Sequence, residues 1–382
     1  MALSLTFAYP GDLDTLTGGY IYDKKIIQAL QNQGWIVERL SLGDAFPDSA
    51  PSSLQVAARR LAEVPAGNML VIDGLTLGTM GDLASLFAIR MPVNAAGCTP
   101  TSEQSGFVAL VHHPLALESG ISQETAKALF DAEAKALAYA SHIIVTSPTT
   151  ADTLQSMFSI NRDRISIVVP GTERPAMHQK TREATPGEPT ILLSVGSIIA
   201  RKGYDVLVNA LAQLRDLNWE LRIVGDQTLD CTVFDALQAQ ITRLNLSDRI
   251  HCLGTLSSDA LDAQFAQADV FVLASHYEGY GMAYAQALMW GLPVIGTTGG
   301  ATRQTVPETA GILVEPGNTD ELTQALHRLI TAPGLRERLA HAAQKHAQAL
   351  PSWEDSARLF GQIMQKNGTR PTAPDPGHTN AR

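Results

Sequence analysis

Two adjacent cations in the second half of the chain have the residue types and the position to bind a diphosphate. Arg201 and Lys202 stand in the segment GSIIARKG, after a strand-like run and ahead of a helical pattern over residues 204–214. Positive side chains and the unpaired N–H groups at the start of a helix both attract phosphate oxygens, and neither needs a metal ion. An ordinary solvated basic pair explains these two residues equally well, so that alternative stays open.

A single carboxylate, Glu278, lies in the segment SHYEGYG, between a strand-like run and a helix that opens at Gly281. The glycines beside it let the backbone approach a ligand closely, and the two tyrosines around it indicate a lined pocket. Gln286 follows about two helical turns further on and therefore lies on roughly the same side of that helix. The alternative role for Glu278 is to cap the helix N-terminus.

Several familiar motifs are excluded. Arg201 occupies the position where a P-loop needs a glycine before its lysine, and Tyr284 occupies the third glycine position of a dinucleotide fingerprint. No histidine pair has the spacing of a metal site, and no Gly-x-Ser-x-Gly elbow occurs. The three cysteines are widely spaced, which argues against a disulfide framework or a zinc site and indicates a reducing compartment. We therefore expect neither a metal nor a cofactor.

The elements that must position these residues are twelve short β-branched runs, which alternate with amphipathic helical stretches. Such alternation predicts an α/β protein with doubly wound parallel sheets and helices on both faces. The strands are expected at residues 3–9, 36–42, 69–73, 107–113, 142–147 and 164–169 in the first half, and at residues 190–196, 219–225, 249–254, 269–275, 292–297 and 311–317 in the second half.

Chain length and one break in the pattern predict two domains. A chain of 382 residues exceeds the roughly 250–300 residues that a single core supports. The predicted parts are a first domain over residues 1–170, a proline-rich linker over 171–189, a second domain over 190–350, a terminal helix over 351–366 that returns toward the first domain, and a disordered tail over 367–382.

Charge and hydropathy exclude further classes of protein. There are 28 Lys and Arg residues against 38 Asp and Glu residues, a net charge of −10, and a nucleic-acid-binding surface would need a basic face. The N-terminus lacks the basic segment of a signal peptide, and no run reaches the roughly 18 apolar residues of a membrane span. The sequence predicts a cytoplasmic protein with at most peripheral membrane contact and no nucleic-acid partner.

Glycine-rich and polar segments follow most of the strands, at the end of an open parallel sheet where ligands bind. Gly18 and Gly19 follow the first strand, and His112 and His113 follow the fourth. Strand-to-helix turns need glycine in any case. Two sets of such loops on two domains nevertheless favour a binding site in a cleft between the domains.

The stretch from residue 275 to residue 295, SHYEGYGMAYAQALMWGLPVI, resembles the signature helix of the family 4 retaining glycosyltransferases, or glycosyl transferases group 1. The segments VGSIIARKG, IVGD and TTGGATRQTVPETAGILVEPG fall in the family's order and spacing. So do Gly18 and Gly19, and a Trp-Glu pair that opens the terminal helix. The resemblance covers about residues 3–365 and is strongest in the second half.

The resemblance implies a GT-B architecture: two Rossmann-like domains face each other across a cleft, and the second holds most of a nucleotide sugar. It implies that Arg201 and Lys202 bind the donor diphosphate and that Glu278 binds sugar hydroxyls beside the reacting carbon. Gln286 stands where the family has a glutamate that bonds the ribose. His112, with His113 as the alternative, is similar to the family's histidine near the donor sugar.

Backbone groups complete the implied donor site. The N–H groups of Met282 and Ala283, after Gly281, assist the cations, and Gly18 and Gly19 let a loop of the first domain close over the phosphates. Ser197 stands where many members have an arginine on the diphosphate, which leaves more of the charge to the other cations. This difference and Gln286 are the two departures from the family pattern, and either one affects donor affinity or the choice of nucleotide.

The implied activity is a metal-independent, retaining transfer of a hexosyl unit from a UDP- or GDP-linked sugar to an acceptor hydroxyl of a glycan, a lipid-linked sugar or a small molecule. No carboxylate pair at nucleophile spacing is visible, which favours front-face attack with a leaving-group oxygen as base. Two alternatives stay open. One is a sugar-nucleotide epimerase or phosphorylase of the same fold, and the other is a non-catalytic nucleotide-sugar-binding protein.

Overall fold

The computed structural model describes residues 3–44, 46–47, 49–65, 68–88, 106–174 and 187–367 of the chain. Most of the predicted linker over 171–189, the predicted tail beyond residue 367, and Cys98 lie outside these residues. The chain forms two compact units. The first contains Met1–Pro170 and Trp353–Arg382, and the second contains Gly171–Ser352.

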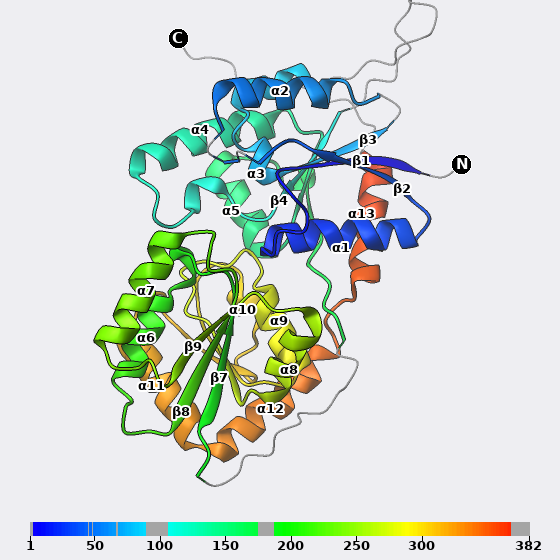
Figure 1. Ribbon diagram of the computed structural model, residues 1–382. Helices are drawn as coiled ribbons and strands as arrows, with labels where there is room; N and C mark the ends of the chain where they lie inside the picture. Colours follow the sequence, from blue (N-terminus) through cyan, green and yellow to red (C-terminus); the bar gives the residue numbers. More distant parts are fainter. Residues whose placement is uncertain are drawn as a thin grey trace, which may run out of the picture. The chain divides into compact units, whose positions relative to one another are not determined.

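The first unit is built on a six-stranded parallel sheet (Figure 1). Its strands are β1 (Ser4–Tyr9), β2 (Ile36–Ser41), β3 (Met69–Asp73), β4 (Val108–Val111), β5 (His142–Val145) and β6 (Ile165–Ile167), in the order β2-β1-β3-β4-β5-β6. The chain therefore moves one way from β1 to β2 and the other way from β3 onward. This reversal makes the carboxyl ends of β1 and β3 the topological switch point of the sheet.

Helices cover both faces of this sheet because right-handed crossovers in opposite directions lie on opposite faces. The helical elements before β7 are α1 (Gly18–Asn32), α2 (Pro51–Ala62), α3 (Gly74–Leu77), η1 (Gly81–Leu86), η2 (Leu115–Leu117), α4 (Gln123–Ala138), α5 (Pro148–Phe158) and η3 (Arg162–Arg164). Buried side chains of α2, α4 and α5 join one apolar core with Ala8 and Ile72 of the sheet. On the opposite face, α1 packs against the last helix, α13 (Trp353–Asn367).

The second unit repeats the plan with the other common strand order. Its strands are β7 (Thr190–Val195), β8 (Trp219–Val224), β9 (Ile250–Gly254), β10 (Val270–Val272), β11 (Val294–Thr297) and β12 (Gly311–Val314), all parallel, in the order β12-β11-β10-β7-β8-β9. The order reverses between β7 and β10, which pair through Val270 with Leu192 and Phe271 with Leu193. The switch point of this sheet is therefore at the carboxyl ends of β7 and β10.

The helical elements of the second unit are η4 (Ala200–Lys202), α6 (Tyr204–Ala212), α7 (Cys231–Arg243), α8 (Ser258–Gln267), α9 (Met282–Met289), α10 (Thr302–Thr305), α11 (Thr319–Thr331) and α12 (Pro333–Ala347). Helix α6 packs against α7 and α11, whereas α9 packs against α10 and α12. One large apolar core, which includes Trp219, Phe271 and Tyr284, fills this unit.

All twelve strands predicted from the sequence are present, and the prediction of two doubly wound parallel sheets is confirmed. The main differences are at the ends of elements. The fourth strand ends at Val111, so His112 and His113 leave the ladder, and the helix expected over 204–214 ends at Ala212. The terminal helix includes Asn367, where the tail was expected to begin.

Helix α13 is part of the core of the first unit although 182 residues of the second unit precede it in the chain. Phe360 is fully buried and stacks on Phe7 of β1, with ring centroids 6.3 Å apart. Trp353 meets Tyr22 of α1 edge-on at 5.8 Å. A Cβ at Gly361 would stand 2.9 Å from the ring of Trp35, so glycine is what allows this close approach.

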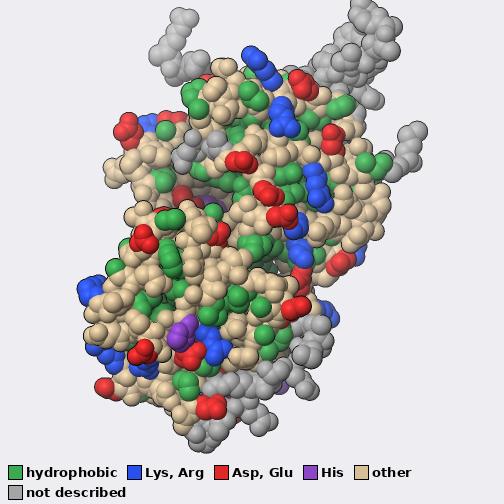
Figure 2. All heavy atoms as spheres, in the orientation of Figure 1, with side chains coloured by type: hydrophobic (Ala, Val, Ile, Leu, Met, Phe, Trp, Pro, Cys, Tyr) green, Lys and Arg blue, Asp and Glu red, His purple; other side chains and the backbone are tan. Residues whose placement is uncertain are grey.

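Among the described residues, every helix is too short or too polar to cross a bilayer. On the face of the molecule that Figure 2 shows, the described Lys and Arg side chains stand among Asp and Glu side chains and form no continuous basic field.

Replacing Phe360 by alanine should destabilise the first unit by about 3–5 kcal/mol, because a large aromatic side chain leaves a cavity against the sheet. Urea unfolding followed by tryptophan fluorescence measures this change, to which Trp35 and Trp353 contribute from the first unit and Trp219 and Trp290 from the second. Leu359→Ala is the matched control, because Leu359 is next to Phe360 in the chain but is 43% exposed. This replacement should lower the free energy of unfolding by less than about 1 kcal/mol. Equal losses in the two variants would contradict the role assigned to α13.

Candidate functional site

The switch point of the second sheet brings together three of the residues singled out in the sequence. Arg201 and Lys202 lie in the 3₁₀ turn η4, on the loop after β7, and Glu278 lies on the loop after β10. The two cations precede α6 rather than standing in its first turn, because Gly203 separates them from it. Parallel strands that neighbour each other at a switch point direct such loops to the same place.

Lys202 and Glu278 form the central ion pair of this site. Lys202 Nζ donates to Glu278 Oε1 at 2.6 Å, and Ser275 Oγ donates to the same oxygen at 2.6 Å. Arg201 lies further off, with its Nη1 3.9 Å from Glu278 Oε2. The same Nη1 donates to the backbone carbonyl of Tyr277 at 2.9 Å. The carboxylate is only 7% exposed, so these cations offset most of the cost of burying its charge.

Backbone contacts fix the two loops against each other. A Cβ at Gly203, whose φ is +64°, would stand 2.2 Å from the carbonyl oxygen of Ala274 at the end of β10, so the cation loop rests directly on the carboxylate loop. Gly300 approaches Glu278 as closely from the other side, and Ala301 N donates to Glu278 O at 2.8 Å. The position of Glu278 is therefore set by three loops and not by its own strand alone.

The charge of Glu278 is stabilised despite its burial. Burial by itself would raise the pKa of this carboxyl, but the charges of Lys202 and Arg201 and the hydrogen bonds from Lys202 and Ser275 outweigh it and hold the pKa below its ordinary value of 4.5. Glu278 is thus a carboxylate at neutral pH and can only accept hydrogen bonds.

Helix α9 begins beside this carboxylate. Gly281 is its N-cap and offers no side-chain cap, and in the described part of the chain the N–H groups of Met282 and Ala283 have no backbone partner. These groups carry the partial positive charge of a helix N-terminus. Gln286 is half-buried one turn along the same helix.

The switch point of the first sheet brings together three of the residues singled out in the sequence. Gly18 and Gly19 open helix α1 after the loop that follows β1, and His112 follows β4. A Cβ at Gly19 would stand 3.3 Å from His112 Cδ2, so the imidazole packs against the first turn of α1. The alternative histidine, His113, instead has its Nε2 3.3 Å from Oε2 of Glu118.

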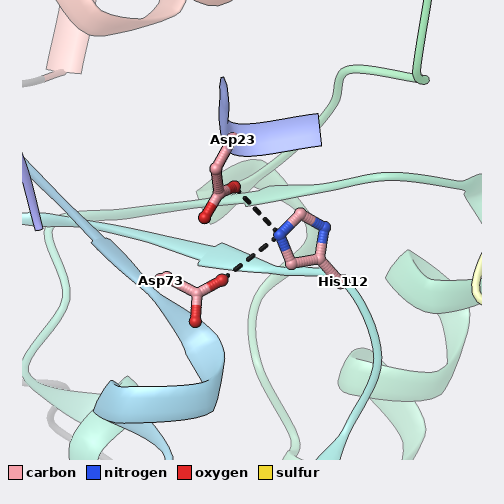
Figure 3. Close-up of side chains that lie close together, drawn as sticks. All are labelled: Asp23, Asp73 and His112. Atoms are coloured by element: carbon pink, nitrogen blue, oxygen red, sulfur yellow. Dashed lines mark hydrogen bonds and ion pairs between the residues drawn. The ribbon is translucent and has the colours of Figure 1, made fainter. Parts of the chain in front are cut away.

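Two buried aspartates hold the imidazole of His112 (Figure 3). Its Nε2 lies 3.1 Å from Oδ1 of Asp23, on α1, and 3.2 Å from Oδ2 of Asp73, at the end of β3. Asp23 is 1% exposed and Asp73 is 3% exposed, while the histidine side chain keeps 23% of its surface. Sequence analysis missed both aspartates, and the three residues are also a set that could ligate a metal ion.

A buried glutamate, Glu133 of α4, supports the loop that carries His112. Its Oε2 accepts a hydrogen bond from the backbone N–H of Leu115 at 3.0 Å, and the side chain is 1% exposed. Burial raises the pKa of Glu133 to about 8, although the bond from Leu115 lowers it in part. Sequence analysis did not find this residue, because a glutamate in an amphipathic helix usually faces solvent.

The sequence therefore identified residues that the fold gathers in two places: Arg201, Lys202, Glu278, Gly281, Met282, Ala283 and Gln286 in the second unit, and Gly18, Gly19 and His112 in the first. Their catalytic and binding roles stay predictions. Asp73 had a readable signal, because it ends a buried strand beside the switch point. Asp23 had none, because it lies five residues inside a helix.

Replacing Glu133 by glutamine should stabilise the protein more at pH 8 than at pH 5. The folded pKa of about 8 lies above the ordinary value of 4.5, so between these values the unfolded chain loses a proton that the folded chain keeps, and wild-type stability falls as pH rises. The glutamine oxygen still accepts from Leu115 but does not titrate. The free energy of unfolding of Glu133→Gln, relative to that of the wild type, should therefore rise by about 2–4 kcal/mol between pH 5 and pH 8.

Urea unfolding of wild type and Glu133→Gln at the two pH values measures this difference. Glu337→Gln, on the exposed side of α12, is the control and should show the same difference from wild type at both values. A Glu133→Gln advantage that is constant with pH would show that the buried carboxyl is not protonated in the folded protein.

Comparison with known proteins finds a family match in the second unit. The family model of glycosyl transferases group 1 matches residues 177–346. Mannosylfructose-phosphate synthase of Agrobacterium fabrum (strain C58) is 26% identical over 237 residues, which are 58% of this chain and 52% of that protein. The chain spans between about half and three quarters of the length of the curated relatives it matches.

Solved structures show the fold over nearly the whole chain. Sucrose-phosphate synthase (tll1590) from Thermosynechococcus elongatus superposes with a TM-score of 0.76 at 21% identity and covers 95% of this chain and 98% of its own. Anabaena Alr3699/HepE, in complex with UDP and glucose, has a TM-score of 0.71 at 16% identity over 94% of this chain and 99% of its own. These likenesses show the GT-B fold that the sequence predicted. The family match agrees with the resemblance: residues 177–346 are similar to the glycosyl transferases group 1 family.

Proposed function

We propose that the protein is a metal-independent, retaining glycosyltransferase that moves a hexosyl unit from a UDP- or GDP-linked sugar to an acceptor hydroxyl. The observation that carries the proposal is the pairing of Lys202 and Arg201 with the buried carboxylate of Glu278 beside the N-terminus of α9. One group in this set can only accept hydrogen bonds, and the others can only donate them.

This arrangement matches the two ends of a nucleotide sugar. A diphosphate needs cations and N–H donors, which Lys202, Arg201 and the first turn of α9 provide. Sugar hydroxyls need a hydrogen-bond acceptor, which Glu278 provides. When the glycosidic bond breaks, negative charge grows on the leaving diphosphate, and fixed donors stabilise that charge without reorganising.

The proposed identity of the donor nucleotide is inferred from solved structures of similar proteins. Anabaena Alr3699/HepE has been solved with UDP and glucose, which favours a uridine nucleotide here. Retention of configuration and the absence of a metal requirement rest on the family resemblance, and cytoplasmic location rests on the sequence. The acceptor is a glycan, a lipid-linked sugar or a small molecule, and the first unit is its expected binding side.

A second candidate function is a nucleotide-sugar-binding protein without activity. Two positions favour it: Gln286 and Ser197 replace the family's glutamate and arginine. Ser197 is 8% exposed, so it fills a buried position where the sequence resemblance placed a cation. The proposal of an active transferase is preferred because Glu278 and both remaining cations are paired within one site.

Replacing Glu278 or Lys202 by alanine should lower sugar transfer while the fold survives. Loss of one fixed donor to the leaving group costs about 10²–10³ in rate, and loss of Glu278 removes the acceptor for the sugar hydroxyls. Turnover with a UDP-sugar and circular dichroism measure the two effects. Lys345→Ala, an exposed cation on α12, is the control and should keep wild-type turnover. Wild-type rates in a folded Glu278→Ala variant would contradict the proposed function.

Millimolar UDP or GDP should raise the thermal unfolding temperature by a few degrees, and EDTA should not change the shift. A ligand at 100 times its Kd stabilises by about 2.7 kcal/mol, which in a protein of this size moves Tm by several degrees. ADP and NAD serve as comparison ligands, and Lys202→Ala should reduce the shift. Stabilisation by NAD alone would show that the second unit binds another class of nucleotide.

A further inference from the structure

Tyr284 is the residue of helix α9 to which the proposed reaction gives no role. In the sequence it occupies the position where a dinucleotide fingerprint has its third glycine, the residue that lets a helix pack close to a strand. In the structure this tyrosine is fully buried. A bulky side chain with a polar tip therefore fills the space between the first turn of α9 and the sheet, where the fingerprint has no side chain.

Two glycines make room for the ring. A Cβ at Gly281, the N-cap of α9, would stand 2.6 Å from Cδ2 of Tyr284, and a Cβ at Gly296 of β11 would stand 2.9 Å from its hydroxyl oxygen. Both distances are shorter than van der Waals contact. Gly281 also has a φ of +87°, whereas at Gly296 the three nearest atoms all belong to the tyrosine, so the ring is what requires glycine there.

The hydroxyl of Tyr284 joins α9 to the carboxyl end of β10. It donates at 2.8 Å to the backbone carbonyl of Leu273, the first residue after that strand. Leu273 is itself held by β11, because its N–H donates to Ile295 O at 3.0 Å. Burial raises the pKa of the Tyr284 hydroxyl well above its ordinary value of 10, so the group keeps its proton and stays a donor.

The carbonyl that accepts this bond belongs to the segment that carries the ion pair of the second unit. The next residue is Ala274, whose carbonyl oxygen would stand 2.2 Å from a Cβ at Gly203, so this residue seats the cation loop. Ser275 follows and donates from Oγ to Glu278 Oε1 at 2.6 Å. One hydroxyl thus connects the turn that presents the N–H groups of α9 to the segment that fixes the carboxylate and the cations.

The first turn of α9 is also tied to Tyr284 through the backbone. Tyr284 N donates to Gly281 O at 2.9 Å, which closes this turn around Met282 and Ala283. A shift of the turn toward or away from the loop that carries Glu278 would therefore have to move the ring or break the bond of its hydroxyl.

We propose that Tyr284 is a positioning residue, which holds the first turn of α9 at a fixed place relative to Glu278 and Lys202. It is fully buried and acts through the N–H groups of Met282 and Ala283. As far as it concerns the donor, this inference rests on the proposed function. Cations and N–H groups hold one diphosphate together only while the distance between them is kept, and a misplacement of about 1 Å can cost about 10²-fold in rate.

Core packing is the alternative explanation for this residue, and the hydroxyl distinguishes the two. The ring of Tyr284 meets Phe271 edge-on at 5.7 Å and belongs to the apolar core of the second unit. Packing needs the ring alone, and phenylalanine supplies a ring of the same shape. The hydroxyl adds a bond that ends on the backbone of the site. Tyr284→Phe therefore removes the link and keeps the packing.

Amide hydrogen exchange followed by mass spectrometry tests the link without any ligand. In Tyr284→Phe, residues 273–286 should exchange about tenfold faster or more, because local opening becomes easier where the hydroxyl no longer anchors the segment. The amides of His276 and Glu278 report on it, since they donate to Arg201 O and Gly299 O on the neighbouring loops. Exchange in the rest of the second unit should stay at the wild-type rate.

Trp219→Phe is the matched control in the same unit. Trp219 is 1% exposed and its Nε1 donates to the backbone carbonyl of Leu214 at 2.8 Å, so this replacement also removes a buried hydrogen bond to a carbonyl. Trp219 opens β8 and therefore lies at the end of the sheet opposite the switch point. The variant should lose at least as much thermal stability as Tyr284→Phe, yet exchange over residues 273–286 should not change.

Titrations with UDP and with uridine measure the consequence for the site. Uridine lacks the diphosphate, so the comparison isolates the contacts that Tyr284 is proposed to position. In Tyr284→Phe the Kd for UDP should rise about tenfold, because the N–H groups of α9 no longer meet the phosphates in the right place. The Kd for uridine should stay at the wild-type value, and Trp219→Phe should leave both values unchanged.

Two results would overturn the inference: unchanged exchange over residues 273–286 in a folded Tyr284→Phe, and an equal loss of UDP and uridine affinity in that variant. Where Tyr284→Phe does not fold, Gly296→Ala is the second variant, because its Cβ would displace the hydroxyl from Leu273. It should reproduce the faster exchange and the weaker UDP binding. If the wild type binds neither UDP nor GDP, the proposed function fails, but the exchange experiment still decides whether the hydroxyl fixes the segment.

Discussion

The reversal of strand order within each sheet is the constraint on which both sites depend. In an open parallel sheet, the loops that follow two adjacent strands run to opposite faces at the point where the direction of winding changes. Each unit has one such point, between β1 and β3 in the first and between β7 and β10 in the second. The charged residues of each site follow these strands or a direct neighbour of them, so the topology gathers groups that are far apart in the sequence.

The two sites solve the problem of a buried charge in opposite ways. In the second unit one carboxylate, Glu278, is surrounded by two cations, which keep it ionised and lower its pKa. In the first unit one imidazole lies beside two carboxylates, whose hydrogen bonds and charges raise its pKa. In both places the opposite charges around the central group favour its charged form. Glu278 is thereby limited to accepting hydrogen bonds.

The sequence predicted the framework well because each signal was local. Runs such as MLVID and TILLSV are short, apolar and rich in branched side chains, as buried strands are, and all twelve predicted strands appear in the fold. Glu278, Arg201 and Lys202 were found because loops after strands are where ligands bind. Asp23 and Glu133 were missed because nothing in a helical pattern distinguishes a carboxylate that faces solvent from one that faces a histidine or a loop N–H. Such contacts depend on how helices dock on the sheet, which one sequence does not encode at any fixed spacing.

The charge of the second site bears on how tightly it holds a donor under the proposed function. Arg201 and Lys202 supply two positive charges, and Glu278 cancels one of them. The start of α9 adds about half a charge, which leaves the site less positive than a diphosphate is negative. An arginine in place of Ser197 would close that gap, and the buried serine leaves it open. Donor binding must therefore draw more of its free energy from the base, the ribose and the sugar than from the phosphates. Since Gln286 accepts a ribose hydroxyl more weakly than a carboxylate would, the contacts of Glu278 with the sugar carry a larger share, and the choice of donor sugar should depend on them more than the choice of nucleotide does.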